Sequence, residues 1–219
     1  MKLVVKFGGT SLATVKDIKN VVKTVDKISK KNKTVVVCSA IDDITDELIE
    51  ISSLIERGNK KDANRMLAKI SQKHKQFAEH LITNPKILKP LSNKLNSDLS
   101  ELEELIHGLI LLGEVTPRSY DYLISFGERL SINLVSFSLQ EMKNKSVPLS
   151  GKEAGIVTDS NFGDSRPLMD TTRIRLSKTI GDYFDKKSIP VIAGFAGADQ
   201  HGKTTTFGRG GSDYTATII

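Results

Sequence analysis

The α/β character of the chain is decided by residues 3–38, which read LVVKFGGTSLATVKDIKNVVKTVDKISKKNKTVVVC. The β-branched run at residues 3–7 predicts a strand that ends at a glycine pair. Apolar residues at helical spacing follow, and residues 34–38 form a second apolar run, as expected for a strand covered on both faces. Strand, helix and strand in this short span make a βαβ unit, so the two strands should be parallel.

The central part of the chain is predicted to be helical. A short helix follows the second strand, and residues 60–113 keep a helical pattern without a strand signal, with breaks at Pro85 and Pro90. We therefore expect a helical excursion packed beside the sheet. Pro117 opens a further helix that continues through residues 126–137.

The chain then returns to strands. Residues 146–149 predict a short strand, and residues 150–167 predict a loop around a brief extended piece. Thr171 or Thr172 is the expected N-cap of a helix that reaches Lys187.

Residues 189–213, IPVIAGFAGADQHGKTTTFGRGGSD, concentrate the candidate chemistry. They predict a buried strand at residues 189–193, a hairpin tip at residues 198–201 and then a glycine pair before a helix start. Glycines before a helix N-terminus let backbone N–H groups face an anion. Arg209 adds a planar cation and Asp213 a carboxylate in the first helical turn, so this stretch predicts a binding site.

The composition excludes several classes of function. Of 219 residues, 32 are basic and 26 acidic, with a net charge of +6 and 5% aromatic residues. Because the charges are mixed and aromatic residues are few, we expect no nucleic-acid binding. The single cysteine, Cys38, fits a reducing compartment. Without a long apolar run or a signal-like N-terminus, we expect a cytoplasmic protein that does not bind membranes.

Three predicted strand ends carry groups suited to anions. They are Lys6 with Gly8 and Gly9, residues 39–45, and residues 209–213. The carboxyl ends of parallel strands gather ligands at one edge, so these groups should share one crevice. The sequence has neither a P-loop nor the Rossmann spacing of glycines, and its histidines lack metal-ligand spacing. The residues alone therefore indicate an α/β protein that binds a phosphate or a carboxylate.

Four motifs together resemble those of the aspartate kinase family. They are KFGGTS at residues 6–11, Ser39-Ala40 with Thr45, FGERLS at residues 126–131 and TTFGRGGSD at residues 205–213. They occur in that family's order and approximate spacing, and the resemblance runs from residue 3 to the last residue. It implies the amino-acid kinase fold, a three-layer sandwich with a mainly parallel sheet between helices.

The resemblance also implies a reaction. The γ-phosphoryl group of ATP, with Mg²⁺, would be transferred to the side-chain carboxylate of L-aspartate to give 4-phospho-L-aspartate. This is the first step in the biosynthesis of lysine, threonine and methionine. Because a carboxylate is already ionised at neutral pH, such an enzyme mainly positions two anions and stabilises charge on the transferring group.

Individual roles follow from the same resemblance. Lys6 and Asp213 would be catalytic, with Lys6 holding the transferring phosphoryl group and Asp213 orienting the lysine or a magnesium-bound phosphate. Arg209 would pair with the α-carboxylate of aspartate, and Glu128 would meet its ammonium group. The further substrate-binding residues would be Ser39, Thr45 and Ser212, and the phosphate-binding residues Gly8, Gly9, Gly210 and Gly211. No residue is expected to be a metal ligand of the protein itself.

Two departures from the family pattern affect these expectations. Residues 41–44 read IDDI where family members commonly carry small residues, and carboxylates there would repel an anionic substrate unless they point away, cap the helix or meet a metal. The sequence also stops at Ile219, inside the helix begun at Ser212. We therefore expect residues 1–219 to be the N-terminal, amino-acid-binding part of the kinase domain, without the nucleotide-binding half or ACT domains, and inactive alone.

Two other functions remain open. The parent protein could be another amino-acid kinase, acting on glutamate or N-acetylglutamate, or the chain could be a non-catalytic aspartate-binding module. Helices that lack their neighbours would leave apolar surface uncovered, so we also expect self-association into a homo-oligomer.

Overall fold

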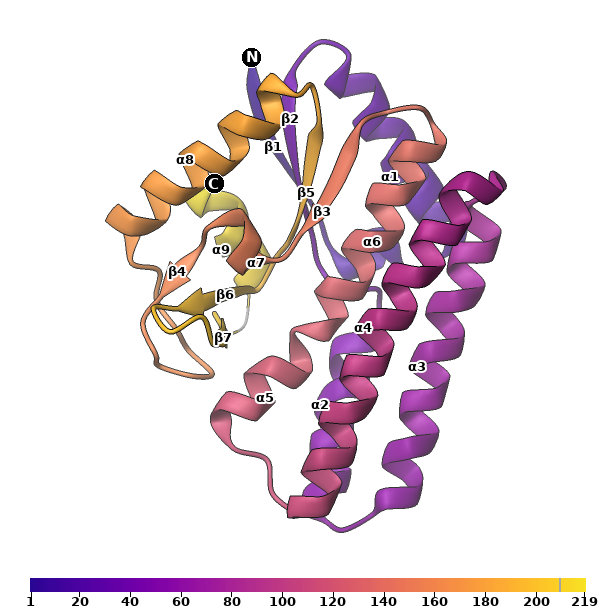
Figure 1. Cartoon of the computed structure of the whole chain (residues 1–219), viewed down its shortest axis with the longest axis vertical. Coiled ribbons are helices and arrows are strands. Elements are labelled where there is room, and N and C mark those ends of the chain that lie inside the picture. The colour runs from indigo at the N-terminus through magenta and orange to yellow at the C-terminus, as the bar shows by residue number, and fades with distance from the viewer. Residues whose placement is uncertain (209) are drawn as a thin grey trace.

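A parallel sheet lies at the centre of the fold, between helices (Figure 1). The computed structural model describes residues 1–208 and 210–219. Within them, the larger sheet has the strand order β1-β2-β5-β3, and each of these pairings is parallel. The strands are β1 (Lys2–Phe7), β2 (Lys33–Cys38), β5 (Ile189–Ala193) and β3 (Ser146–Leu149). The predicted α/β class and mainly parallel sheet are confirmed.

The opening βαβ unit forms as its sequence pattern predicts. Helix α1 (Val15–Ser29) begins where the Thr14 side chain accepts a hydrogen bond from the Asp17 N–H. It then returns the chain to β2, which pairs in parallel with β1. The residues of β2 after Lys33 are buried because helices cover both faces of the sheet.

The helices form two layers around the sheet (Figure 1). Helices α1 and α6 (Phe126–Glu141) lie on one face, whereas α8 (Met169–Asp185) and α9 (Gly211–Ile218) lie on the other. The larger hydrophobic cluster joins α1 and α6 to the sheet, and a smaller cluster lies under α8.

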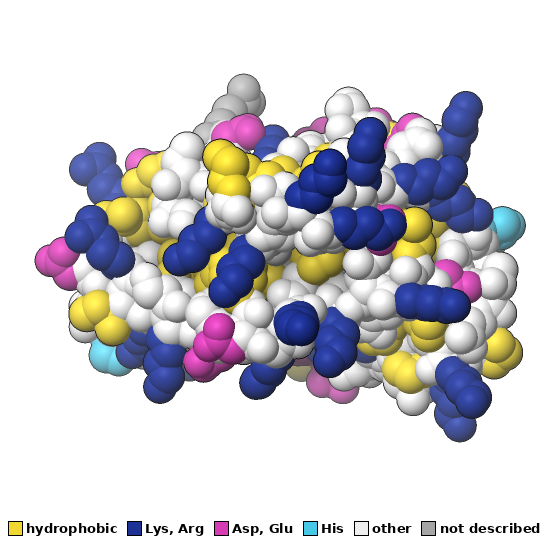
Figure 2. Space-filling model, turned by 90° about the horizontal axis from the view of Figure 1, so that it is seen from above, with side chains coloured by type: hydrophobic (Ala, Val, Ile, Leu, Met, Phe, Trp, Pro, Cys, Tyr) yellow, Lys and Arg dark blue, Asp and Glu magenta, His cyan; other side chains and the backbone are white. Residues whose placement is uncertain are grey.

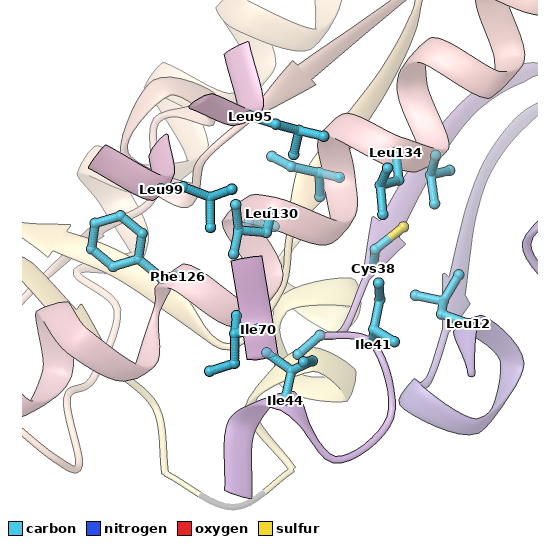
Figure 3. Packing of buried hydrophobic residues seen from close by; sticks show 14 of the residues in the cluster. Leu12, Cys38, Ile41, Ile44, Ile70, Leu95, Leu99, Phe126, Leu130 and Leu134 are labelled. Carbon is cyan, nitrogen blue, oxygen red and sulfur yellow. The ribbon is translucent and has the colours of Figure 1, made fainter. Parts of the chain in front are cut away.

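The helical excursion packs outside α6. It consists of α3 (Lys60–Leu81) and α4 (Pro85–Leu112), which follow the short helix α2 (Ile44–Glu56). Figure 3 shows Ile70 of α3 and Leu95 and Leu99 of α4 beside Leu130 of α6. The predicted break at Pro90 is wrong, because α4 continues through this residue with Leu91 and Leu95 buried on one stripe.

The predicted helix from Pro117 onward is divided in two. Helix α5 (Pro117–Ile124) ends before Ser125, and α6 begins immediately after it. The Ser125 hydroxyl donates to the Tyr122 carbonyl at 2.8 Å, a local bond that competes with regular helix geometry. The expectation of one continuous helix is therefore wrong at this residue.

Two boundaries between residues 150 and 172 also differ from expectation. The segment expected to be a loop contains a short helix, α7 (Gly151–Ala154), which starts with a capping box of Ser150 and Glu153. It is followed by β4 (Val157–Thr158), the expected extended piece. Thr172 is not an N-cap, because α8 already begins at Met169 and the buried Thr172 hydroxyl bonds to the backbone of Val157.

A smaller sheet carries the predicted hairpin. Strand β6 (Ala196–Asp199) pairs with β4 in parallel and with β7 (Thr204–Thr206) in antiparallel orientation. The tip lies about two residues later than predicted, because the Asp199 side chain accepts hydrogen bonds from the N–H groups of His201 and Lys203.

The basic residues are dispersed over the surface. Figure 2 shows one face on which Lys and Arg side chains are spread over the whole view, with acidic and apolar side chains between them. Among the described residues, no helix is both long enough and apolar enough to cross a membrane.

Candidate active site

The first and last motifs meet at the edge of the sheet. Lys6 near the end of β1 places its Nζ 2.9 Å from Oδ1 and 3.0 Å from Oδ2 of Asp213, in the first turn of α9. The two residues are 207 positions apart in sequence. The Asp213 side chain keeps 70% of its surface exposed, so this ion pair is accessible to a ligand.

Glycines allow α9 to approach the sheet this closely. Gly210 precedes the helix with φ 75°, a conformation that favours glycine, and Gly211 is the first helical residue. A Cβ on Gly194, directly after β5, would lie 2.7 Å from the Ser212 side chain. The N-terminus of α9 therefore sits against the end of β5, with Ser212 buried and Asp213 exposed.

The glycine turn after β1 lies beside the same ion pair. Gly8 precedes a short 3₁₀ helix, η1 (Gly9–Leu12), and a Cβ on Gly8 would lie 3.6 Å from the Nζ of Lys6. A Cβ on Gly9 would lie 3.4 Å from the carbonyl oxygen of Ala40. The turn thus connects the Lys6 side of the site with the end of β2.

Glu128 reaches the end of β2 from α6. Its Oε1 accepts a hydrogen bond from the Ala40 N–H at 3.2 Å, and its Oε2 is buried without a partner among the described residues. Burial raises the pKa of Glu128 to about 8, although the N–H groups of Ala40 and of Glu128 itself act in the opposite direction. A buried carboxylate oxygen without a hydrogen-bond partner is suited to bind a cationic group of a ligand.

Gly127 explains how Glu128 comes so close. A Cβ on Gly127 would lie 2.8 Å from the Cβ of Ala40, a distance that real Cβ atoms essentially never show. Glycine in a helix costs about 1 kcal/mol relative to alanine, so the sequence predicts a packing or ligand reason for it. The structure supplies close packing between α6 and the end of β2.

Ser39 and Thr45 flank the loop between β2 and α2. Ser39 is half-buried, and its carbonyl oxygen accepts a 2.6 Å hydrogen bond from the Ser131 hydroxyl of α6. Thr45 is half-buried in the first turn of α2. Between them, Asp43 is exposed at the N-cap position of α2, where the helix dipole stabilises a negative charge. The Asp42 carbonyl accepts from Lys73.

Arg209 lies outside the described residues, so its predicted contact with an α-carboxylate remains a prediction. The described residues on either side, Gly208 and Gly210, have φ values of 71° and 75°.

A charged network that the sequence motifs did not predict lies on another side of α6. Asp98 of α4 is fully buried and accepts from Lys94 at 3.1 Å, Arg129 at 2.8 Å and Asn133 at 2.8 Å. Arg129 also pairs with Glu101, which accepts from the Tyr122 hydroxyl. A signal was present, because Asp98 falls on the apolar stripe of its helix between Leu95 and Leu102.

A second missed residue is Asp121 of α5, which is buried and accepts hydrogen bonds from Gly163 and Thr206. It precedes Glu128 by seven residues, or about two helical turns, so its position on the inward side could have been noticed.

A large cleft of the described residues does not coincide with these predicted residues. It encloses about 750 Å³ and is lined by Arg129 and Asn133, among others, but by none of the described residues predicted to form the site. Its buried charges already bind one another, whereas the Glu128 Oε2 is buried without a partner among the described residues and the Asp213 carboxylate is exposed. We therefore place the candidate site at the sheet edge.

Comparison with known proteins agrees with this architecture. A model of the amino acid kinase family matches residues 1–219. The chloroplastic aspartokinase 3 of Arabidopsis thaliana is 32% identical over 219 residues, which are 99% of this chain and 38% of that protein. An aspartokinase of Geobacillus stearothermophilus is 31% identical over 219 residues, with 99% and 39% covered.

A solved structure is similar over the whole chain. The crystal structure of E. coli aspartokinase III in complex with aspartate and ADP superimposes with a TM-score of 0.86 at 25% identity. The match covers 100% of this chain and 46% of that one, and the chain spans about two fifths of the curated relatives it matches. With a family match over its full length and this shared fold, the chain belongs to the amino acid kinase family.

Proposed function

We propose that these residues form the amino-acid-binding side of the active site of an aspartate kinase. The enzyme would phosphorylate the side-chain carboxylate of L-aspartate with ATP, the first step in lysine, threonine and methionine biosynthesis. The observation that carries the proposal is the ligand-accessible Lys6–Asp213 ion pair. It lies beside the glycine turn at Gly8 and Gly9, which packs against Ala40, and the Ala40 N–H donates a hydrogen bond to Glu128. The similarity to aspartokinase III, whose structure contains aspartate and ADP, supports this choice of substrates.

The chemistry requires little activation of the acceptor. An oxygen of the aspartate side-chain carboxylate attacks the γ-phosphorus of ATP, the bond to the β–γ bridging oxygen breaks, and ADP leaves with that electron pair. Because the carboxylate is ionised at neutral pH, no general base is needed. The site must bring two anions together and stabilise the charge on the transferring group.

Two groups of the site would recognise the ends of aspartate. The buried Glu128 carboxylate would bind the ammonium group, which would provide the charge partner that its Oε2 otherwise lacks among the described residues. Arg209 would bind the α-carboxylate, for which its planar guanidinium is suited. Ser39, Thr45 and Ser212 are the remaining groups proposed to contact the substrate.

Cationic and backbone groups would hold the phosphates. Lys6 would exchange its contact with Asp213 for the transferring phosphoryl group. Backbone N–H groups of Gly8, Gly9, Gly210 and Gly211 would contact phosphate oxygens, helped by the N-terminus of α9. Mg²⁺ would arrive with ATP and neutralise phosphate charge, and the exposed Asp213 carboxylate would orient Lys6 or the magnesium-bound phosphate.

The proposal is tested with the intact protein that contains these residues. Purified protein should form hydroxamate-trapped acyl phosphate with L-aspartate and ATP, and a panel with L-glutamate and N-acetyl-L-glutamate should give far lower kcat/KM. A preference for either glutamate substrate would replace aspartate kinase by another amino-acid kinase. Aspartate binding without turnover would instead identify a binding module.

The role of Arg209 has its own measurement. Arg209→Ala should raise the KM for aspartate by about 100-fold or more, because a charge-assisted bidentate contact is lost, with little change in the KM for ATP. An effect confined to the KM for ATP would contradict the assignment.

A further inference from the structure

Asp121 holds the strand that leads to the candidate site. Its Oδ2 accepts hydrogen bonds from the N–H groups of Thr206 and Gly163, both at 2.9 Å, and its Oδ1 accepts from the Thr206 hydroxyl at 2.7 Å. Asp121 is fully buried, and no cation pairs with it within the described part of the chain. The carboxylate is therefore held by backbone and hydroxyl donors of strand β7 and by a backbone donor of the loop around Gly163.

Thr206 is fixed at each of its polar groups. Besides the two bonds to Asp121, its carbonyl oxygen accepts from the N–H and the hydroxyl of Ser165, each at 2.9 Å. Thr206 is the last residue of β7, and the next residue, Phe207, donates its N–H to the Phe195 carbonyl at 2.9 Å. The chain therefore leaves β7 in one fixed direction, and a Cβ on Gly211, the first residue of α9, would lie 3.1 Å from the Cβ of Phe207.

Asp121 is also linked to Glu128 through consecutive helices. Asp121 lies on α5 and Glu128 on α6, and the two helices adjoin at Ser125. Under the proposed function, Glu128 binds the ammonium of aspartate, whereas Ser212, at the start of α9, is another group that contacts the substrate. One helix pair would therefore set the separation between the two groups that recognise the amino acid.

We propose that Asp121 is a positioning residue for aspartate recognition, acting through Thr206 and Phe207 on the N-terminus of α9, where Ser212 lies. This inference rests on the proposed function. Asp121 itself does not touch the substrate. Its loss should therefore weaken aspartate binding selectively and leave recognition of ATP and the chemical step much less affected.

The test uses matched threonine variants, because Asp121→Ala could prevent folding. Thr206→Val removes the hydroxyl that donates to Asp121 and keeps the size of the side chain. Thr205→Val is the control, since the neighbouring Thr205 hydroxyl is also buried but bonds to Thr158 at 2.6 Å. In the intact protein, Thr206→Val should raise the KM for aspartate about 10-fold or more, because a hydrogen bond to a charged group is lost.

Three further readings decide the outcome. The KM for ATP should stay within about twofold of wild type, Thr206→Ser should restore the KM for aspartate, and Thr205→Val should leave it near wild type. If Thr206→Val and Thr205→Val lower the melting temperature alike and neither changes the KM for aspartate, Asp121 is purely structural and the inference is wrong. If wild-type protein shows no aspartate-dependent turnover, the proposed function fails first and the positioning role fails with it.

Discussion

Neighbouring residues of α6 have opposite surroundings. Arg129 is bound by Asp98 and Glu101, and Asp98 in turn has partners on both oxygens. Glu128, one residue earlier, is as deeply buried as Asp98 but has one oxygen without a partner among the described residues. Asp98 and Glu128 are both buried acids on helices. Only Asp98 has its hydrogen-bonding and charge requirements met by other described residues.

The difference separates a structural role from a ligand-binding role. The Asp98 network joins α4 to α6 and is complete without a ligand, so it stabilises the fold that presents Glu128. Glu128 carries the cost of burial without a cation, which is the condition expected where a ligand supplies the missing charge. Changes at Asp98 and at Glu128 should therefore affect different properties.

The largest loss of stability should follow Asp98→Ala. Removing one member of a buried ion-pair network leaves its partners unpaired and costs about 3–5 kcal/mol of unfolding free energy. Urea unfolding measures this change, with Glu103→Ala as a control because Glu103 is exposed on the same helix. A loss no greater than that of the control would show that the network contributes nothing to the fold.

The pH dependence of stability should identify Glu128. Its pKa is raised from 4.5 to about 8 in the folded state, so the folded chain holds a proton that the unfolded chain has lost between these values. Stability from this group is fully present below pH 4.5 and is lost as pH rises through 8, at roughly 1 kcal/mol per pH unit in between.

The matched variant isolates that contribution from the other titrating groups. Glu128→Gln cannot ionise, so the difference in unfolding free energy between wild type and variant should change in favour of the variant from pH 5 to pH 8. A constant difference over this interval would mean that Glu128 is already ionised in the folded chain.

A methyl group at Gly127 should have a smaller effect. Gly127→Ala improves helix propensity by about 1 kcal/mol, but overpacking against Ala40 should cost about 1–3 kcal/mol. The variant should be slightly destabilised and should lose aspartate affinity as α6 moves. Gly108→Ala is the control, because no atom lies within 4 Å of a Cβ there and only the gain in helix propensity is expected. Gly127→Ala more stable than wild type would contradict the close packing.

The smallest effect on stability is expected at Lys6. Lys6→Met removes an ion pair whose Asp213 partner is exposed to solvent, and ion pairs open to solvent contribute about 0–1 kcal/mol. Thermal unfolding should therefore change little although phosphoryl transfer is lost. A stability loss comparable to that of Asp98→Ala would assign the Lys6–Asp213 pair to the fold.

Local sequence patterns predicted much of the architecture. The alternation of strand and helix was enough for the parallel sheet, because crossover geometry leaves few alternatives. It also predicted that Lys6 and residues 209–213 share one edge, and the structure brings Lys6 to Asp213. The predicted roles of the site residues still await measurement.

Features that depend on distant contacts could not be predicted. Thr172 is of a residue type that often caps helices, but its hydroxyl forms hydrogen bonds with the backbone of Val157, which lies 15 residues earlier. The burial of Glu128 results from packing against Ala40, 88 positions away. Short-range signals were also missed, since the Ser150–Glu153 capping box is visible in the sequence and marks the start of α7.

The most direct test compares Glu128→Gln with Asp98→Asn in the intact protein. Each variant replaces a buried carboxylate by an amide of the same shape, and each is measured for aspartate affinity and unfolding free energy at pH 7. Glu128→Gln should weaken aspartate binding by about 2–5 kcal/mol without loss of stability. Asp98→Asn should lose stability and keep aspartate affinity within about twofold. Equal losses of both properties in the two variants would contradict the assignment of Glu128 on α6 to ligand binding and of Asp98 on α4 to the fold.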